Sequence, residues 1–216
     1  PKDKVKISVV GKYIRVQDAY KSIKEAIVHG GIANNVNIDF NWVDSEELDN
    51  DQIVKNTLKG SDGILVPGGF GVRGIEGKIK AIKYARENKI PFLGICLGMQ
   101  SAVIEFANHV LKLKNANSTE FDRDTHYPVI CLLEEQKEVK EMGGTMRLGA
   151  YPCKLKRNTK AYEAYKEKIV FERHRHRYEF NTAYREVFEK EGLIVSGESP
   201  DGSLIEIMEY NKHPWF

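Results

Sequence analysis

Short apolar strands alternate with amphipathic helices through the first 110 residues, and this alternation restricts the possible folds more than any other feature. The pattern predicts strands at residues 4–10, 36–43, 63–66 and 90–95, with helices at 19–29, 46–58, 77–88 and 98–109. Parallel strands need crossovers of a dozen or more residues, which these helices supply. The sequence therefore predicts an α/β fold of the flavodoxin-like kind, with an open, mostly parallel, doubly wound sheet.

The pattern changes after about residue 128. Strands are predicted at residues 129–133, 148–155, 192–196 and 204–208, and Asp201-Gly202 is a hairpin turn signal between the last two. We expect these strands to be antiparallel additions to the same sheet. Neither a repeat nor a linker interrupts the sequence, so a single domain over residues 1–216 is expected.

Composition excludes several classes of protein. The 33 basic and 31 acidic residues nearly cancel, which argues against nucleic-acid binding driven by charge. No apolar run approaches the roughly 18 residues that a membrane span needs, and no secretion signal opens the sequence. Three scattered cysteines do not suggest a disulfide framework, so a reducing, cytoplasmic environment is expected.

The segment Gly94-Ile95-Cys96-Leu97-Gly98 lies between a predicted strand and a predicted helix. Small residues two positions before and after the cysteine are typical of a nucleophile elbow, whose strained turn needs glycines. The amino end of the helix would also favour a thiolate. The alternative is a cysteine that only packs, and the elbow spacing favours the nucleophile. Cys131 and Cys153 lie in strand-like segments without an elbow, and we interpret both as structural.

A glycine-rich loop, Pro67-Gly68-Gly69-Phe70-Gly71, follows another short apolar strand. Three glycines in four positions leave backbone N–H groups uncovered, so the loop could aim donors at an oxyanion or a phosphate. Its order matches neither the dinucleotide nor the P-loop pattern. A turn without a ligand is the alternative. Because neighbouring parallel strands bring the loops at their carboxyl ends together, an oxyanion role beside Cys96 is favoured.

A basic run, RHRHR at residues 173–177, could mark a nucleic-acid patch or a localisation signal. Glu172 and Glu179 flank the run and the chain is nearly neutral, which argues against both. His174 and His176 would share one face of an extended segment, so a metal site is conceivable. No third ligand is evident at a suitable spacing, and zinc sites need three or four, so no metal is expected.

Seven motifs together resemble one known family. They are GKY (11–13), PGGFGVRG (67–74), GICLGMQ (94–100), NANSTEF (115–121), GGTMRLG (143–149), ERHRHRYEFN (172–181) and HPWF (213–216). The chain resembles the class I glutamine amidotransferase domains, and within them the glutaminase domains of the CTP synthase family. The resemblance implies hydrolysis of glutamine to glutamate and ammonia. The ammonia would supply a preceding synthetase domain that converts UTP to CTP in pyrimidine nucleotide biosynthesis.

The resemblance also implies the role of each site residue. Cys96 would attack the side-chain amide of glutamine and form a thioester, which water then releases as glutamate. The N–H groups of Gly69 and Leu97 would receive the oxyanion. Glu120 could pair with the α-ammonium group of the substrate. The glutamine-binding set implied by the family is Gly68, Gly69, Phe70, Leu97, Gly98, Met99, Gln100, Glu120 and Arg177.

The same resemblance sets expectations for cofactors and partners. No cofactor is expected in this domain, whereas the parent enzyme would use ATP and Mg²⁺ and be activated by GTP, for which residues 70–74 are a candidate contact. The expected partners are glutamine and the synthetase domain, in a parent enzyme that is homo-oligomeric, without nucleic acid or membrane. The family's catalytic histidine and glutamate follow HPWF in an H-P-E element, and the sequence stops at Phe216. We therefore expect a piece of a longer polypeptide with weak glutaminase activity on its own.

Two other functions stay open from the sequence alone. The chain could be another class I amidotransferase or a γ-glutamyl hydrolase, and turnover of glutamine against γ-glutamyl peptides would separate these. It could also be an inactive binding module. An electrophilic glutamine analogue would discriminate, because only an activated thiol at Cys96 would be labelled.

Overall fold

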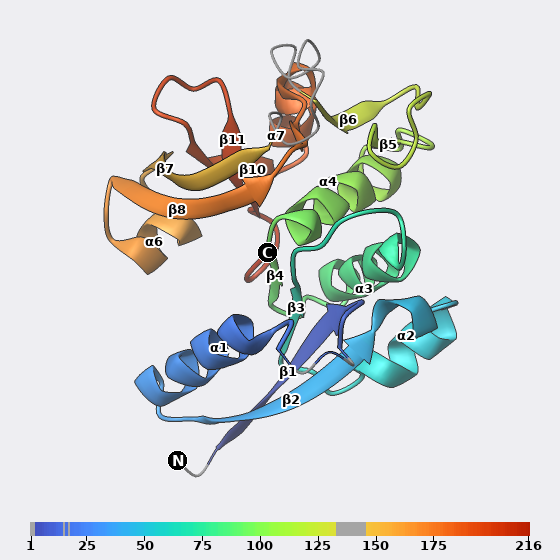
Figure 1. Cartoon of the computed structure of the whole chain (residues 1–216), viewed down its shortest axis with the longest axis vertical. Helices are drawn as coiled ribbons and strands as arrows, with labels where there is room; N and C mark the ends of the chain where they lie inside the picture. Colours follow the sequence, from blue (N-terminus) through green and yellow to red (C-terminus); the bar gives the residue numbers. More distant parts are fainter. Residues whose placement is uncertain (1–2, 15, 17, 133–145) are drawn as a thin grey trace. The chain divides into compact units, whose positions relative to one another are not determined.

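A computed structural model of the chain describes residues 3–14, 16, 18–132 and 146–216. The chain divides into two compact units, Pro1–Ser101 and Ala102–Phe216, with the boundary inside helix α4 (Leu97–His109). Each unit has its own hydrogen-bonded sheets, and Figure 1 labels most of the helices and strands of both.

The N-terminal unit is built on a parallel four-stranded sheet in the order β2-β1-β3-β4. Its strands are β1 (Lys4–Gly11), β2 (Asn37–Asp44), β3 (Gly63–Val66) and β4 (Phe92–Gly94). The connecting helices are α1 (Lys21–Ala33), α2 (Asp51–Leu58) and α3 (Ile75–Glu87). The steps from β1 to β2 and from β2 to β3 run in opposite directions, so right-handed crossovers place α1 and α2 on opposite faces. The predicted doubly wound parallel sheet is confirmed.

Several helix boundaries differ from the prediction, among them the start of α1 at Lys21 and of α3 at Ile75, and two of the differences have identifiable reasons. Helix α1 runs through Gly30-Gly31 instead of stopping there, because Gly31 is buried where the helix meets β2. A side chain there would begin 2.8 Å from Cγ1 of Ile38, so the glycine allows close packing. Residues Ser45–Glu47 form a separate short helix, η1, and α2 starts only at Asp51, where the Asn50 side chain accepts a hydrogen bond from the backbone N of Ile53.

The C-terminal unit contains two more sheets among the residues that the structure describes. One is antiparallel in the order β11-β10-β7-β8, and the other has the order β5-β6-β9. Their strands are β5 (Asn117–Ser118), β6 (Pro128–Cys131), β7 (Arg147–Leu155), β8 (Ile169–His176), β9 (Glu179–Phe180), β10 (Leu193–Glu198) and β11 (Ile205–Tyr210). The helical segments are α6 (Lys160–Tyr165), η3 (Thr182–Tyr184) and α7 (Arg185–Lys190).

The antiparallel prediction is confirmed for β7, β10 and β11, including the hairpin at Asp201-Gly202 between β10 and β11. Strand β6 pairs antiparallel with β9 but parallel with β5. The expectation that these strands extend the first sheet is wrong for the described residues. Strands β7 and β8 pair along eight consecutive positions, and β10 joins β7, so these strands satisfy their backbone groups among themselves.

Aromatic rings fill the core of the C-terminal unit. Phe106 stacks on Phe188 with 5.7 Å between ring centroids, and Phe180 meets Phe188 edge-on at 5.3 Å. Phe106 also meets Tyr210 edge-on at 5.2 Å, so the carboxyl half of α4, β9, α7 and β11 share one apolar cluster.

The described helices are all too short, or too polar, to cross a bilayer.

Candidate active site

Cys96 lies in the turn between β4 and α4, at the carboxyl end of the parallel sheet. The turn is anchored on both sides, because Ile95 N donates to Val66 O at 2.9 Å and Gln100 N donates to Cys96 O at 3.0 Å. The φ angle of Cys96 is 54°, in the left-handed region. The six other described non-glycine residues with positive φ are all Asn or Lys. Such strain in a partly exposed cysteine is typical of a functional turn.

The two glycines around Cys96 are required by close packing. A Cβ atom on Gly98 would collide with the carbonyl oxygen of Val66 in β3. One on Gly94 would lie 2.6 Å from the carbonyl carbon of Gly98. The start of α4 therefore rests directly on strand backbone, and the predicted elbow is confirmed as a structure.

The backbone strain predicts a measurable difference between two variants. Cys96→Gly should be more stable than Cys96→Ala by about 1 kcal/mol, because only glycine adopts a left-handed φ without steric cost. Both variants lose the sulfur, so the difference isolates the backbone. Urea unfolding of the two proteins measures it, and equal stabilities would contradict a strained turn.

The glycine-rich loop lies against the thiol. It follows β3, which pairs with β4 in the sheet. A Cβ atom added to Gly68 would lie 3.4 Å from Cβ and 3.8 Å from Sγ of Cys96. One added to Gly69 would lie 3.4 Å from Cδ2 of Leu97. The two loops thus meet at one edge of the sheet, as expected, and bare backbone faces the sulfur.

Two lysines to which the sequence interpretation gave no role flank this loop. The Lys12 ammonium donates a hydrogen bond to the carbonyl oxygen of Phe70. Lys78, in α3, is fully buried, and its Nζ lies 3.6 Å from the position of a Cβ built on Gly69. Burial, together with the charge of Lys12, lowers the pKa of Lys78 to about 8, although attraction to Cys96 opposes the shift.

A signal for Lys78 was present in the sequence. It occupies a position in the stripe formed by residues 75, 78, 82 and 85, which recur at helical spacing. The other three members, Ile75, Ile82 and Ala85, are buried apolar residues. A lysine within such a stripe must be buried, and a buried lysine calls for a reason.

The remaining predicted site residues divide between the units. The first turn of α4 is formed by Leu97, Gly98, Met99 and Gln100. Phe70, in the glycine-rich loop, is 44% exposed. Glu120 follows β5 in the C-terminal unit, where its backbone N donates to Oγ of Ser118 at 3.1 Å. Arg177 lies in the turn between β8 and β9. The contact of Glu120 and Arg177 with glutamine stays a prediction.

The histidine pair is confirmed on one face of β8, with 2.8 Å between Nδ1 of His174 and Nε2 of His176. The expectation that no third ligand accompanies them is wrong, because Glu206 of β11 comes within 3.6 Å of His174 Nδ1. The reason is long-range strand order, which sequence spacing does not show. Glu206 is also held by Arg147, at 2.8 Å. The positive charge of the Arg147 guanidinium already balances the Glu206 carboxylate. This arrangement favours an ion-pair network over a bound cation.

The charge network around Arg147 is buried. Arg147 also pairs with Glu179 at 3.1 Å, and burial raises the pKa of Glu179 to about 7 although Arg147 opposes the rise. Burial lowers the pKa of His176 to about 4, helped by His174 and Arg147. His176 and Glu179 immediately flank the turn that carries Arg177, so the network holds both ends of that turn.

The other two cysteines differ from Cys96. Cys153 is buried in a small cluster with Leu155 and Val170, and burial raises the pKa of its thiol to about 12. Cys131 ends β6 and is partly exposed, without an elbow. The motif GGTMRLG lies partly outside the described residues, since positions 143–145 are not among them.

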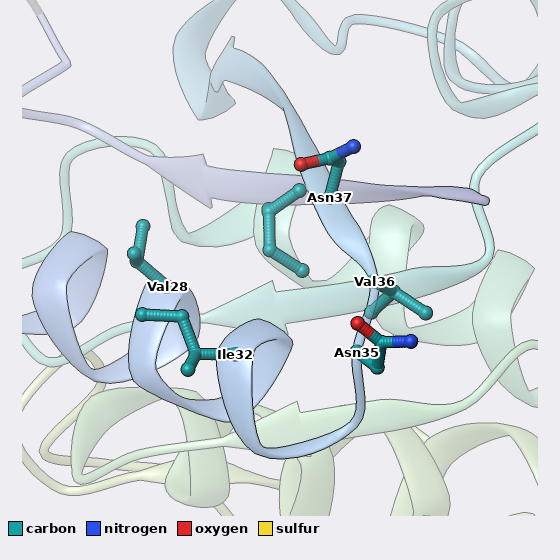
Figure 2. A pocket seen from close by; sticks show the side chains of 6 residues that line it. Val28, Ile32, Asn35, Val36 and Asn37 are labelled. Carbon is teal, nitrogen blue, oxygen red and sulfur yellow. The ribbon is translucent and has the colours of Figure 1, made fainter. Parts of the chain in front are cut away.

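A pocket lies at the amino-terminal ends of the parallel strands, whereas Cys96 lies at their carboxyl ends. Figure 2 shows that α1 and the start of β2 form it, with these lining residues: Val28, Ile32, Asn35, Val36, Asn37 and Ile38. Because β2 begins at Asn37, this is the amino-terminal edge. The pocket is therefore separate from the elbow.

A parallel α/β sheet that carries a strained cysteine elbow beside a glycine loop defines a cysteine-dependent amidotransferase-type site. The family model "Glutamine amidotransferase class-I" matches residues 15–216. The chain belongs to the class I glutamine amidotransferase family, in the branch formed by the glutaminase domains of CTP synthases.

Relatives of known name support this assignment. The chain is 59% identical over 216 residues to the CTP synthase of Caldanaerobacter subterraneus subsp. tengcongensis and 60% identical to that of Carboxydothermus hydrogenoformans. It is covered completely but spans only 40% of the length of these two relatives. A solved structure, the Trypanosoma brucei CTPS glutaminase domain with bound acivicin, matches 98% of this chain with a TM-score of 0.90 and 41% identity. The chain covers 83% of that structure.

Proposed function

We propose that this chain is the glutaminase part of a CTP synthase. It hydrolyses glutamine to glutamate and ammonia, and the ammonia serves a synthetase domain of the same polypeptide that converts UTP to CTP. The observation that carries the proposal is the position of Cys96, strained and partly exposed against the bare backbone of Gly68. The names of the relatives support the substrate and the pathway.

The chemistry follows from the local geometry. The Cys96 thiolate attacks the amide carbon of glutamine, and the carbon–nitrogen bond breaks as the nitrogen takes a proton and leaves as ammonia. The resulting thioester is hydrolysed by water to glutamate and free thiolate. Negative charge develops on the amide oxygen in both steps, and the N–H groups of Gly69 and Leu97 are the proposed donors to it.

The remaining contacts belong to the same proposal. Gly68, Phe70, Gly98, Met99, Gln100 and Arg177 are proposed contacts of glutamine, and Glu120 is proposed to pair with its α-ammonium group. No cofactor acts in this part. ATP, Mg²⁺ and the activator GTP belong to the complete, homo-oligomeric and cytoplasmic enzyme.

A chloroketone analogue of glutamine tests the proposal. We expect one adduct, on the Cys96 peptide, with labelling slowed by free glutamine and less by a γ-glutamyl peptide. Cys96→Ala should abolish the adduct, while Cys131→Ala, the matched control, should leave it unchanged. Mass spectrometry of the digested protein measures both. Equal labelling of Cys131 and Cys96, or no protection by glutamine, would contradict the proposal.

A further inference from the structure

Lys78 carries a buried charge that the fold itself does not explain. The residue is 0% exposed, and within the described part of the chain its Nζ has no hydrogen-bond partner. Its neighbours in the α3 stripe, Ile75, Ile82 and Ala85, are apolar. A buried ammonium group without an acceptor is costly, whereas a methionine would fill similar space without that cost. Packing alone therefore does not account for the lysine.

The ammonium group lies against the glycine-rich loop, next to the residue whose backbone contacts Cys96. Three side-chain atoms converge on the position of a Cβ built on Gly69: Leu97 Cδ2 at 3.4 Å, Lys12 Cε at 3.5 Å and Lys78 Nζ at 3.6 Å. Lys12 is already held by the Phe70 carbonyl. Lys78 therefore lies beside the backbone that faces Cys96, with its charge not committed to another group.

The charged and titratable groups on the elements around Lys78 leave Cys96 as its partner of opposite charge. The elements packed against α3 are β1, η1, α2, β3 and β4, and the charged and titratable residues on them, on α3 and on the adjoining loops are Lys4, Lys6, Lys12, Glu46, Glu47, Asp51, Lys55, Arg73, Glu76, Lys80, Lys83, Tyr84, Arg86, Glu87 and Cys96. Asp51 is paired with Lys83 at 3.6 Å. Glu46 is paired with Arg73 at 3.4 Å, and the Asp44 carboxylate accepts from the backbone N of Glu46. The charges that act on Lys78 are those of Lys12, which repels it, and of Cys96, which attracts it.

We propose that Lys78 is a positioning residue for the nucleophile, whose buried ammonium group stabilises Cys96 as the thiolate. It transfers no proton and touches no substrate; it acts through the sulfur. In a medium of low dielectric such a charge acts much more strongly than a surface lysine. Because the pKa of Lys78 is lowered to about 8, this support is present at neutral pH and fades as the pH rises above 8. The inference rests on the proposed function only in taking Cys96 as the nucleophile.

The pH profile of Cys96 alkylation tests the inference. The rate of iodoacetamide modification is followed by mass spectrometry of the Cys96 peptide from pH 5 to pH 10. In the natural protein the midpoint should lie below the 8.5 of an ordinary thiol. In Lys78→Met the rate at pH 7 should fall at least tenfold, and the rate at pH 10 should change less than twofold. Lys83→Met, on the same helix but paired with Asp51 at 3.6 Å, is the matched control and should keep the natural profile.

Each outcome decides the inference. A midpoint at or above 8.5 in the natural protein overturns it, whether or not the variants fold. An unchanged profile in Lys78→Met, or in Lys78→Gln should the methionine variant not fold, assigns the lysine a structural role and also overturns it. A shifted midpoint in the variant supports it. The chloroketone experiment is separate: a shifted alkylation profile without glutamine protection would refute the proposed function and leave this inference standing.

Discussion

Replacing Gly98 by alanine should lower the free energy of unfolding by about 2–3 kcal/mol, the usual cost of an overpacked contact. The new methyl group would meet the Val66 carbonyl oxygen, and a strand backbone cannot move aside as a flexible side chain can. The start of α4 would then have to shift away from β3, carrying Cys96 with it. We therefore also expect the alkylation of Cys96 at pH 7 to slow by tenfold or more. Urea unfolding and mass spectrometry measure the two effects.

The control for this prediction is the same substitution in open space. Gly30 lies inside α1, is exposed, and has no atom within 4 Å of a Cβ built on it. Gly30→Ala should stabilise the protein by about 0.5–1 kcal/mol, because alanine is the better helix former. It should leave Cys96 unaffected. If Gly98→Ala loses no more stability than Gly30→Ala changes it, the contact between Gly98 and Val66 is not as close as described.

Replacing Arg147 by methionine should destabilise the C-terminal unit by about 3–5 kcal/mol, the cost of removing one partner from a buried ion pair. The side chains of Glu179 and Glu206 are each only 4% exposed and would be left without their cation. Arg173→Met is the matched control, because Arg173 lies on β8 with an exposed side chain and should change stability by less than about 0.5 kcal/mol.

The pH dependence of this variant has a defined sign. The pKa of Glu179 is raised to about 7 in the folded protein, so between pH 4.5 and 7 the folded state holds a proton that the unfolded state releases. Falling pH therefore favours the folded state through this group. Arg147 opposes the rise in the pKa of Glu179, so without Arg147 the stabilisation at low pH should grow. The loss of stability caused by Arg147→Met should therefore shrink as the pH falls from 7 to 5. Adding Glu179→Gln to the variant should remove the part of this dependence that Glu179 causes. Urea titrations at several pH values measure it, and a penalty independent of pH would refute the assignment to Glu179.

The sequence predicted what depends on short segments. The strands of the parallel sheet and the elbow at Cys96 come from apolar runs and glycine spacing within a few residues, so local reading was sufficient. The meeting of the Gly68 loop with the elbow also followed, because parallel neighbours share an edge. Helix starts were less predictable: the pattern predicted one helix from residue 46, whereas Asp44 caps the short helix η1 and Asn50 caps α2 separately.

The sequence did not predict what depends on distant pairing. Glu206 joins His174 only because β10 links β11 to β7, and β7 lies beside β8. No spacing rule connects residues more than thirty positions apart. The separation of the antiparallel strands from the first sheet also depends on long-range strand pairing, which sequence spacing does not show. The burial of Lys78 is a different case, because its position in the buried stripe of α3 follows from helical spacing. It was overlooked because lysines are usually exposed.

The dense contact beneath the elbow has a consequence for protein engineering. Grafting only the five residues around Cys96 into another scaffold would not recreate a reactive turn, because Gly98 owes its place to the carbonyl of Val66 and Gly94 to the backbone of Gly98. The smallest transplantable module comprises β3, its glycine loop, β4 and the opening turn of α4.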